Sequence, residues 1–445
     1  MNREKFKTFT LAILFSMSAF LLLLNISLVG FKFDLKKIYG SPNIKYNIYS
    51  VVRPYRVFVY FGGGKNNTEV LDTQDDYWNQ IKIILKQELS KQKKISEISY
   101  EDYLSKKNMK SIEANFDKGI DVELINKSIF LNESAISDIG DICEILIPLV
   151  DDKSIYFLNN EQKVYKVDLD KVKHIDLVDK LEKKGYTEYF TVDSLFTIDN
   201  KTLIPIKLDG ISYDNISSKN IIDVKDDKLV QKIGENILGN KYDFTNRIVE
   251  KNGNNTFIYG YGEKTLRIYN NGYIEFLNED IDNKNIDLDK SLSIALDFLA
   301  NQNIGIDNLS LYSIEKNSIN NINSYEFNFY YEVNNLKLKI DNVFNSIQIK
   351  IAGEDIYSYK GVLKEVDQFI DGNTDNNIIP PDQILNMNFS LLKKDLKYQS
   401  GEEVWKNIKG VELIYFSKDD YFIPSWKVTI GNSVYIFDAY KGDVL

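Results

Sequence analysis

The side chains that catalyse most hydrolytic and metal-dependent reactions are scarce in this chain. It has one histidine, His174, and one cysteine, Cys143, among 445 residues. Nucleophile–histidine–acid catalysis and most zinc sites need histidine. His174 lies in "VDLDKVKHIDLV", where charged and apolar residues alternate, so we interpret it as a surface residue. Cys143 begins the apolar run "CEILIPLV", which predicts a buried, unreactive thiol.

One acidic segment has ligand types at the spacing of a calcium loop. "DGNTDNNIIPPD" offers oxygen atoms from Asp371, Asn373, Asp375 and Asp382. The sixth position is Asn376 instead of glycine, the twelfth is aspartate instead of glutamate, and two prolines interrupt the segment. These departures favour a solvated linker between domains over a metal site.

Two further motifs carry little chemical information. "FGGGKN" follows the apolar run "YRVFVYF", but a phosphate-binding loop needs two glycines at a wider spacing and a Ser or Thr after the lysine. Among 65 acidic residues some pair will always meet, so a carboxylate pair for glycoside hydrolysis is not a specific signal. We therefore predict no catalytic, cofactor-binding or metal-binding residues, no cofactor, and a protein that is not an enzyme.

The N-terminal stretch "FTLAILFSMSAFLLLLNISLVGF" is uncharged and lies between Lys7 and Lys32. At about 1.5 Å per residue, a helix over 8–31 is long enough to cross a hydrocarbon core of roughly 30 Å. Its small-residue pairs, Ser16 with Ser18 and Ser27 with Gly30, are poorly placed or badly spaced for signal cleavage, which favours an uncleaved anchor. The short basic tail before it is then cytoplasmic, and the body after it is extracytoplasmic.

This predicted span contains a stripe of small residues. Ala12, Ser16 and Ala19 share one face of a helix, in the small-xxx-small pattern that lets two helices approach closely in lipid. We predict that this stripe contacts a partner helix, although small residues also occur in membrane spans by chance.

Composition limits the remaining possibilities. The net charge of −10 and the pI near 5.0 argue against nucleic acid as a partner. The chain is also longer than the ~250 to 300 residues at which a single core stops growing, so more than one domain is expected.

Hydrophobic periodicity predicts an α+β chain with an N-terminal transmembrane helix followed by a multidomain ectodomain of helices packed on antiparallel sheets. Trp78, Ile81, Leu85 and Leu89 predict an amphipathic helix, and Gly239 should end another. The expected parts are a cytoplasmic tail (1–7), the transmembrane helix (8–31), a stalk (32–50), an N-terminal ectodomain (51–225), a central α+β domain (226–370) and a C-terminal α+β module (371–445).

The last predicted hairpin is rich in aromatic residues. It comprises "SWKVTIGNSVYIFDAY", in which two strands flank the turn "GN". Aromatic residues are enriched at protein interfaces, so the hairpin is predicted to present a partner surface. The residues expected to do so are Trp426, Tyr435, Phe437 and Tyr440.

The order of these parts resembles the YycH-type regulators of the WalK (YycG) sensor histidine kinase in low-GC Gram-positive bacteria. The resemblance rests on the N-terminal tail and span, on "VVRPYRVFVYF", and on "NRIVEKNGNNTFIYGYGEKTLRIYNNGYIEF" and "FNFYYEVNNLKLKIDNVFNSIQIKIAGEDIYSYKGVLKEV". The tail "YFIPSWKVTIGNSVYIFDAYKGDVL" is similar to the closing strands of YycI-type proteins and of PepSY modules. The segment 90–220 matches nothing in this family.

The resemblance implies a non-enzymatic, single-pass membrane protein whose extracytoplasmic body regulates a kinase that controls cell-wall metabolism. It also implies association with the kinase and with a YycI-type protein. Two alternatives remain open. One is an anchored PepSY-like module that binds a wall ligand or restrains a protease, and the other is a wall hydrolase that uses carboxylates.

Overall fold

A computed structural model describes residues 47–63, 66–71, 73–91, 93–131, 134–208, 213–220, 223–281, 284–302, 304–340, 347–362, 364–370 and 377–445. Ile48–Leu445 form one compact unit. The predicted helix over 8–31, with Ala12, Ser16 and Ala19, lies outside the described residues, as do the first positions of the calcium-like loop.

The predicted fold class is wrong. Strands contribute more of the described residues than helices do, and most of these strands belong to two large sheets. None of the described helices is both long and apolar enough to cross a bilayer. Sheet predominates because several strands are long: Leu309–Ile319 and Ile322–Val333 have 11 and 12 residues.

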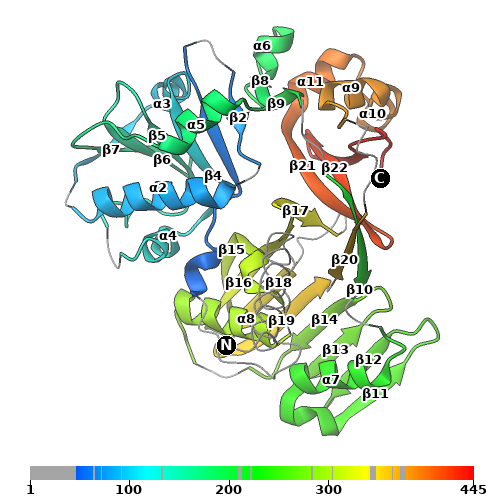
Figure 1. Ribbon diagram of the computed structural model, residues 1–445. Coiled ribbons are helices and arrows are strands. Elements are labelled where there is room, and N and C mark those ends of the chain that lie inside the picture. The colour runs from blue at the N-terminus through cyan, green and yellow to red at the C-terminus, as the bar shows by residue number, and fades with distance from the viewer. Residues whose placement is uncertain are drawn as a thin grey trace, which may run out of the picture. The chain divides into compact units, whose positions relative to one another are not determined.

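The N-terminal part contains a seven-stranded antiparallel sheet in the order β2-β1-β4-β5-β6-β7-β3 (Figure 1). β1 forms within the run "YRVFVYF", whose β-branched and aromatic residues favour strands. The strands are β1 (Arg56–Tyr60), β2 (Thr68–Glu69), β3 (Ile95–Ile98), β4 (Ser111–Ile120), β5 (Ile142–Pro148), β6 (Ser154–Asn159) and β7 (Val164–Asp168).

Helices cover both faces of this sheet. Trp78 of α2 packs edge-on against Phe116 of β4 on one face, with ring centroids 5.6 Å apart. On the other face Tyr103 of α3 is fully buried in a cluster that includes Phe58 and Leu146. The helices and the first 3-10 turn are η2 (Ile48–Val51), α2 (Gln74–Leu89), α3 (Tyr100–Lys106), α4 (Val122–Ser128) and α5 (Asp176–Lys184).

A two-stranded hairpin follows and lies between distant parts of the chain. Tyr189 of β8 exchanges backbone hydrogen bonds with Asn67 beside β2. Asn200 and Thr202, just before β9, donate side-chain hydrogen bonds to the carbonyl of Ile408 in the C-terminal part. The elements are β8 (Glu188–Thr191), α6 (Val192–Phe196) and β9 (Leu203–Lys207).

The remaining strands form a fourteen-stranded sheet whose main path is β11-β12-β13-β14-β19-β18-β16-β17-β21-β22-β10-β20. β15 lies off this path and pairs with β16. The strands of the central part are β10 (Asn215–Asn220), β11 (Thr245–Val249), β12 (Asn255–Tyr259), β13 (Lys264–Ile268), β14 (Tyr273–Asn278), β15 (Leu309–Ile319), β16 (Ile322–Val333), β17 (Leu336–Lys339), β18 (Ile347–Ala352), β19 (Asp355–Val362) and β20 (Lys364–Ile370).

Short helices pack on this sheet. α7 ends at Gly239, whose φ of +57° favours glycine, as predicted. The turn "NNG" joins β13 to β14, and Gly272 in that turn has a φ of +82°. The helices are α7 (Asp227–Leu238), η3 (Gly239–Phe244), α8 (Leu288–Asn301) and η4 (Ile306–Asn308).

β17 joins the central strands to the C-terminal strands. It is antiparallel to β16 and parallel to β21, through the pair Leu338 and Tyr415. α9 and α10 meet at Asn388, whose side chain donates to the carbonyls of Ile384 and Gly442. The C-terminal elements are α9 (Pro381–Met387), α10 (Phe389–Leu396), α11 (Gly401–Asn407), β21 (Ile408–Lys418), β22 (Tyr421–Ile430) and β23 (Ser433–Asp438).

Candidate functional site

Several clusters of ionisable side chains are buried in the described part of the chain, and the first considered is a pair of carboxylates. Glu113 of β4 and Glu144 of β5 both contact the ammonium group of Lys107, at 2.8 and 2.7 Å. Tyr60 donates to Glu113 at 2.7 Å and Tyr103 donates to Glu144 at 2.6 Å. The two carboxylates are therefore separated by little more than one lysine nitrogen.

The pKa values of these two carboxylates shift in opposite directions. Burial and the nearby charge of Glu113 raise the pKa of Glu144. Burial also acts on Glu113, but the charge and hydrogen bond of Lys107 outweigh it and lower its pKa. Carboxylate pairs of this kind are typical of general acid–base catalysis, which is the chemistry of the hydrolase alternative.

The surroundings of this pair favour a structural interpretation. The side chain of Glu113 is only 2% exposed, and Tyr60 and Tyr103 are buried against it. A glycosidase needs room for a sugar between its carboxylates, whereas here the space holds the ammonium group of Lys107. We interpret the cluster as a satisfied buried polar network.

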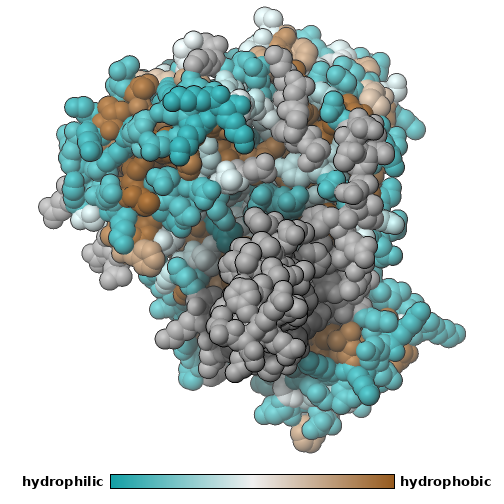
Figure 2. All heavy atoms as spheres, viewed as in Figure 1, coloured by the Kyte–Doolittle hydropathy of each residue, from teal (hydrophilic) through white to brown (hydrophobic). Residues whose placement is uncertain are grey.

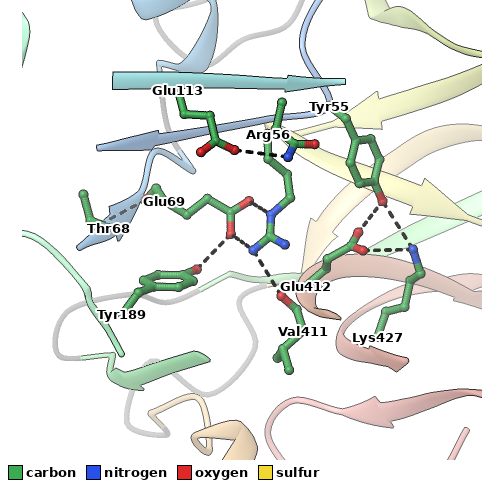
Figure 3. A network of polar contacts seen from close by, with 10 residues as sticks. Tyr55, Arg56, Thr68, Glu69, Glu113, Tyr189, Val411, Glu412 and Lys427 are labelled. Carbon is green, nitrogen blue, oxygen red and sulfur yellow. Dashed lines mark hydrogen bonds and ion pairs between the residues drawn. The ribbon is translucent and has the colours of Figure 1, made fainter. Parts of the chain in front are cut away.

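The second cluster lies where β1, the β8–β9 hairpin and β21 meet (Figure 3). Arg56 of β1 binds Glu69 of β2 through two hydrogen bonds of 2.7 and 2.5 Å. Tyr189 donates to the same carboxylate at 3.1 Å, and Arg56 also donates to the backbone carbonyl of Val411 at 3.2 Å. Arg56 and Glu69 together thus link β1 and β2 to the β8–β9 hairpin and to β21.

Next to Arg56, Tyr55 contacts the C-terminal strands. Its hydroxyl donates a hydrogen bond to Glu412 of β21 (Figure 3). Lys427 of β22 lies directly across from Glu412 and contacts it at 3.1 Å. Burial would raise the pKa of Glu412, but the charges of Lys427 and Arg56 outweigh it and lower that pKa to about 2. Glu412 is therefore held as a carboxylate.

Two further tyrosines and one lysine complete this cluster. The rings of Tyr55, Tyr312 and Tyr330 contact one another pairwise, with centroids 4.6 to 5.5 Å apart. Lys337 of β17 places its ammonium group 4.2 Å from the centroid of the Tyr55 ring, at a cation–π distance. We name Tyr55, Tyr312, Tyr330 and Lys337 the tyrosine–lysine site.

The residues predicted from the sequence as an aromatic partner surface lie in other surroundings. Trp426 and Phe437 are fully buried under the C-terminal helices, and the Trp426 indole donates to the carbonyl of Ile379. Tyr435 and Tyr440 are partly buried, and Tyr440 exchanges hydrogen bonds with the backbone of Tyr213. Only the two tyrosines therefore offer any surface to a partner, and their role in binding stays a prediction.

The exposure of the histidine and the burial of the cysteine are close to what the sequence predicts. His174 is 66% exposed and lies 2.9 Å from Asp176. Cys143 is partly buried, and burial raises the pKa of its thiol to about 11, which makes the reactive thiolate rare at neutral pH. Among the described residues, no group of three or more His, Cys, Asp or Glu side chains could hold a metal ion.

An exposed apolar region lies at the end of the large sheet, on β11 and the segments beside it. β11 is the first strand of the main path and pairs with β12 alone in the described chain. Figure 2 shows hydrophobic side chains among hydrophilic ones over α7 and β11–β13, at the lower right. The exposed fractions are 73% for Phe244, 50% for Ile248, 60% for Val249 and 105% for Tyr261. We name these four residues the β11 edge surface.

Comparisons with known proteins give little guidance. No family model matches the sequence, and no curated protein matches it. One solved structure, an uncharacterized protein from Eubacterium rectale, is similar over 60% of this chain and 94% of its own, with 15% sequence identity and a TM-score of 0.35.

Proposed function

We propose that this chain is a non-enzymatic regulator that acts through protein–protein contacts. As the YycH-type resemblance implies, its partners are a sensor histidine kinase of the WalK type and a YycI-type protein, and its body acts outside the cytoplasm. The observation that carries the proposal is the β11 edge surface, because the backbone of an edge strand can pair with a partner strand and its exposed apolar side chains can pack against that partner.

The edge of β11 is not protected in the ways that natural edge strands usually are. Its sequence is "TNRIV", with no proline or lysine. The only charged side chain, Arg247, is held by Asn255 and Asp227 and so is directed back to its own sheet. Ile248 and Val249 point to opposite faces of the strand, so a paired strand could contact either.

The two clusters of ionisable side chains described above also support a non-enzymatic function. The carboxylate pair Glu113 and Glu144 is closed around Lys107, and Glu412 is held by Lys427 and Tyr55. A substrate would have to displace these partners, and the free-energy cost of separating a charged pair grows as the pair is more deeply buried.

In-cell photocrosslinking of the full-length chain tests the proposal. A photoreactive residue is placed at Ile248, and in a second variant at Val249, in cells that contain the kinase and the YycI-type protein. The matched control position is Glu161, whose side chain is 63% exposed in the turn between β6 and β7 of the other sheet.

We expect crosslinks to the kinase or the YycI-type protein from Ile248 or Val249, and none from Glu161. Equal capture from all three positions, or none of either partner from β11, contradicts the proposal. The substitution Ile248→Lys should reduce capture while leaving the thermal unfolding temperature nearly unchanged, because the side chain is already half exposed.

A further inference from the structure

Within the described residues, the part of the chain that forms the seven-stranded sheet is joined to the rest by one backbone crossing. After α5 the chain passes Gly185, whose φ is +95° and at which a Cβ atom would meet no atom within 4 Å. The buried Arg56 cluster lies near this crossing, because Tyr189 of β8 donates to the Glu69 that Arg56 binds. Arg56 also donates to the carbonyl of Val411 in the large sheet. One end of the contact between the two sheets is therefore fixed.

The other end of this contact is held by ion pairs. Lys316 of β15 pairs with Asp121 at the start of α4, and Lys127 at the end of α4 pairs with Asp289 of α8. We name these four residues the clasp. In Figure 1, α4 lies on the side of the seven-stranded part that faces α8, and β8 and β9 lie at the opposite end. Solvent reaches the clasp, since the side chain of Lys316 is 51% exposed, whereas that of Arg56 is 12% exposed.

The turn η2 lies at the clasp. It contacts both α4 and α8, and its last residue, Val51, is fully buried. Burial and the charge and hydrogen bond of Asp289 raise the pKa of Tyr49, whose hydroxyl therefore lies beside the clasp. Residues 1–46 join the described chain at this turn. Separation of α4 from α8 would therefore release the segment that follows the N-terminal residues.

A bulge in β4 directs one more carboxylate to β15. The pairing of β4 with β5 is irregular between Asn115 and Ile120, and Asp117 within the bulge has a φ of +53°. The side chain of Asn115 accepts a hydrogen bond of 2.9 Å from the backbone of Asp117, whose carboxylate accepts one from Tyr312 of β15. Bulges redirect side chains, and a left-handed conformation outside glycine has a cost that persists only where the surroundings impose it. The bulge is thus shaped for contact with the large sheet.

The two ends of this contact differ in how easily they separate. Removing one partner from a buried, hydrogen-bonded charge pair such as Arg56 and Glu69 is strongly unfavourable. An ion pair that solvent reaches contributes little, and salt screens it. Polar contacts between parts of one chain resemble transient interfaces, across which relative motion is expected. The clasp is therefore the end that opens, and the Arg56 cluster is the pivot.

We propose that the clasp is a conformational switch controlled by charge. When its ion pairs are screened or reversed, the seven-stranded part turns about the Arg56 cluster, α4 separates from α8, and η2 is released. This inference goes beyond the proposed function, because it does not involve the β11 edge surface. No covalent step is involved.

Hydrogen–deuterium exchange of the purified full-length protein, followed by mass spectrometry, tests the proposal. The peptides that contain η2 and α4 are compared at low salt and at about 1 M salt, where the Debye length falls to about 3 Å. We expect exchange at least about threefold faster at high salt in both peptides, because the screened ion pairs no longer hold the clasp. The peptide that contains β6 and β7 should not change, which excludes a general loss of stability.

Charge reversal tests the same contact at low salt. Lys127→Asp and Asp289→Lys each place like charges opposite one another, and each should speed the exchange of η2 by at least about threefold. The double variant, Lys127→Asp with Asp289→Lys, restores opposite charges and should return exchange close to that of the unmodified chain. Lys163→Asp is the matched control, since Lys163 pairs with Glu161 at 2.7 Å in the turn between β6 and β7. It should leave the exchange of η2 unchanged.

The salt comparison uses the unmodified chain and so keeps the proposal testable if a variant does not fold, which circular dichroism verifies. The proposal is overturned if exchange of η2 is the same at both salt concentrations or if the single variants exchange like the unmodified chain. It is also overturned if the double variant exchanges as fast as Lys127→Asp, because the effect would then come from a weakened α4 and not from the charge pair.

Discussion

Arg56 and Glu412 illustrate, at the scale of single residues, how this fold keeps charged groups in its interior. Arg56 is 12% exposed at its side chain and Glu69 is 6% exposed. Each charge is matched by a partner of opposite sign and by further hydrogen bonds, which is the condition under which buried charges are tolerated. Loss of one partner is therefore far more costly than loss of both.

The first prediction concerns the Arg56–Glu69 pair. Arg56→Met leaves the Glu69 carboxylate buried with only Tyr189 and should lower the free energy of unfolding by about 3 to 5 kcal/mol. The double variant Arg56→Met with Glu69→Gln should recover about 1 to 3 kcal/mol of this loss. Urea denaturation measures both, and an equal loss in the single and double variants would contradict the prediction.

The second prediction concerns pH and Glu412. Its pKa is about 2 in the folded chain, below the ordinary value of 4.5, so its contribution to stability is complete above pH 4.5. That contribution should be lost as the pH falls towards 2 and amounts to about 3 kcal/mol.

Urea denaturation between pH 2.5 and pH 7 measures this contribution. Glu412→Gln should lose stability at pH 7 and show a flatter decline with falling pH than the unmodified chain. Parallel curves for the two proteins would show that Glu412 is not the group responsible.

At the scale of secondary-structure elements, the local sequence acts most clearly at the ends of helices, where single residues determine where a helix begins and ends. α7 begins at Asp226, whose carboxylate accepts hydrogen bonds from the backbone of Lys228 and Leu229. It ends at Gly239, with a φ of +57° and a ψ of −134°, a region closed to residues with a Cβ atom.

The third prediction is that Gly239→Ala lowers the free energy of unfolding by about 1 to 3 kcal/mol, because alanine cannot adopt this backbone conformation without strain. Gly305→Ala is the control. A Cβ atom at Gly305 would lie 3.7 Å from its nearest neighbour, an ordinary contact, and its φ is −68°. Thermal unfolding should show a large decrease for the first variant and little change for the second.

Local elements are what the sequence predicts well here. β1, α2, α7 and the β13–β14 turn follow from hydrophobic period and turn residues. The cluster around Arg56 and Tyr55 could not be predicted, because Tyr55 and Glu412 are separated by 357 residues and no local pattern connects them. One signal was present: Arg56 lies inside the otherwise apolar run "YRVFVYF", where a charged residue needs a partner.

Strand pairing between distant segments determines the whole molecule. β10 pairs with both β20 and β22, and β17 runs parallel to β21. One core cluster contains Ile204 and Ile216 together with Leu336, Leu338 and many residues of the C-terminal part. These contacts join segments on both sides of residues 225 and 370 within the compact unit Ile48–Leu445, and the domain boundaries predicted there stay a prediction.

The fourth prediction follows from this continuity: a chain that ends at residue 371 should not fold. It lacks β21 and β22, so β10 and β17 lose partners, and buried residues such as Ile216 and Leu338 become exposed. Exposed apolar surface of this extent favours aggregation or a loosely packed state over a native fold. Size-exclusion chromatography and near-ultraviolet circular dichroism test this, and calorimetry of the full chain should show one cooperative transition. A soluble truncated chain with a native near-ultraviolet spectrum would instead show that the C-terminal part is an independent domain.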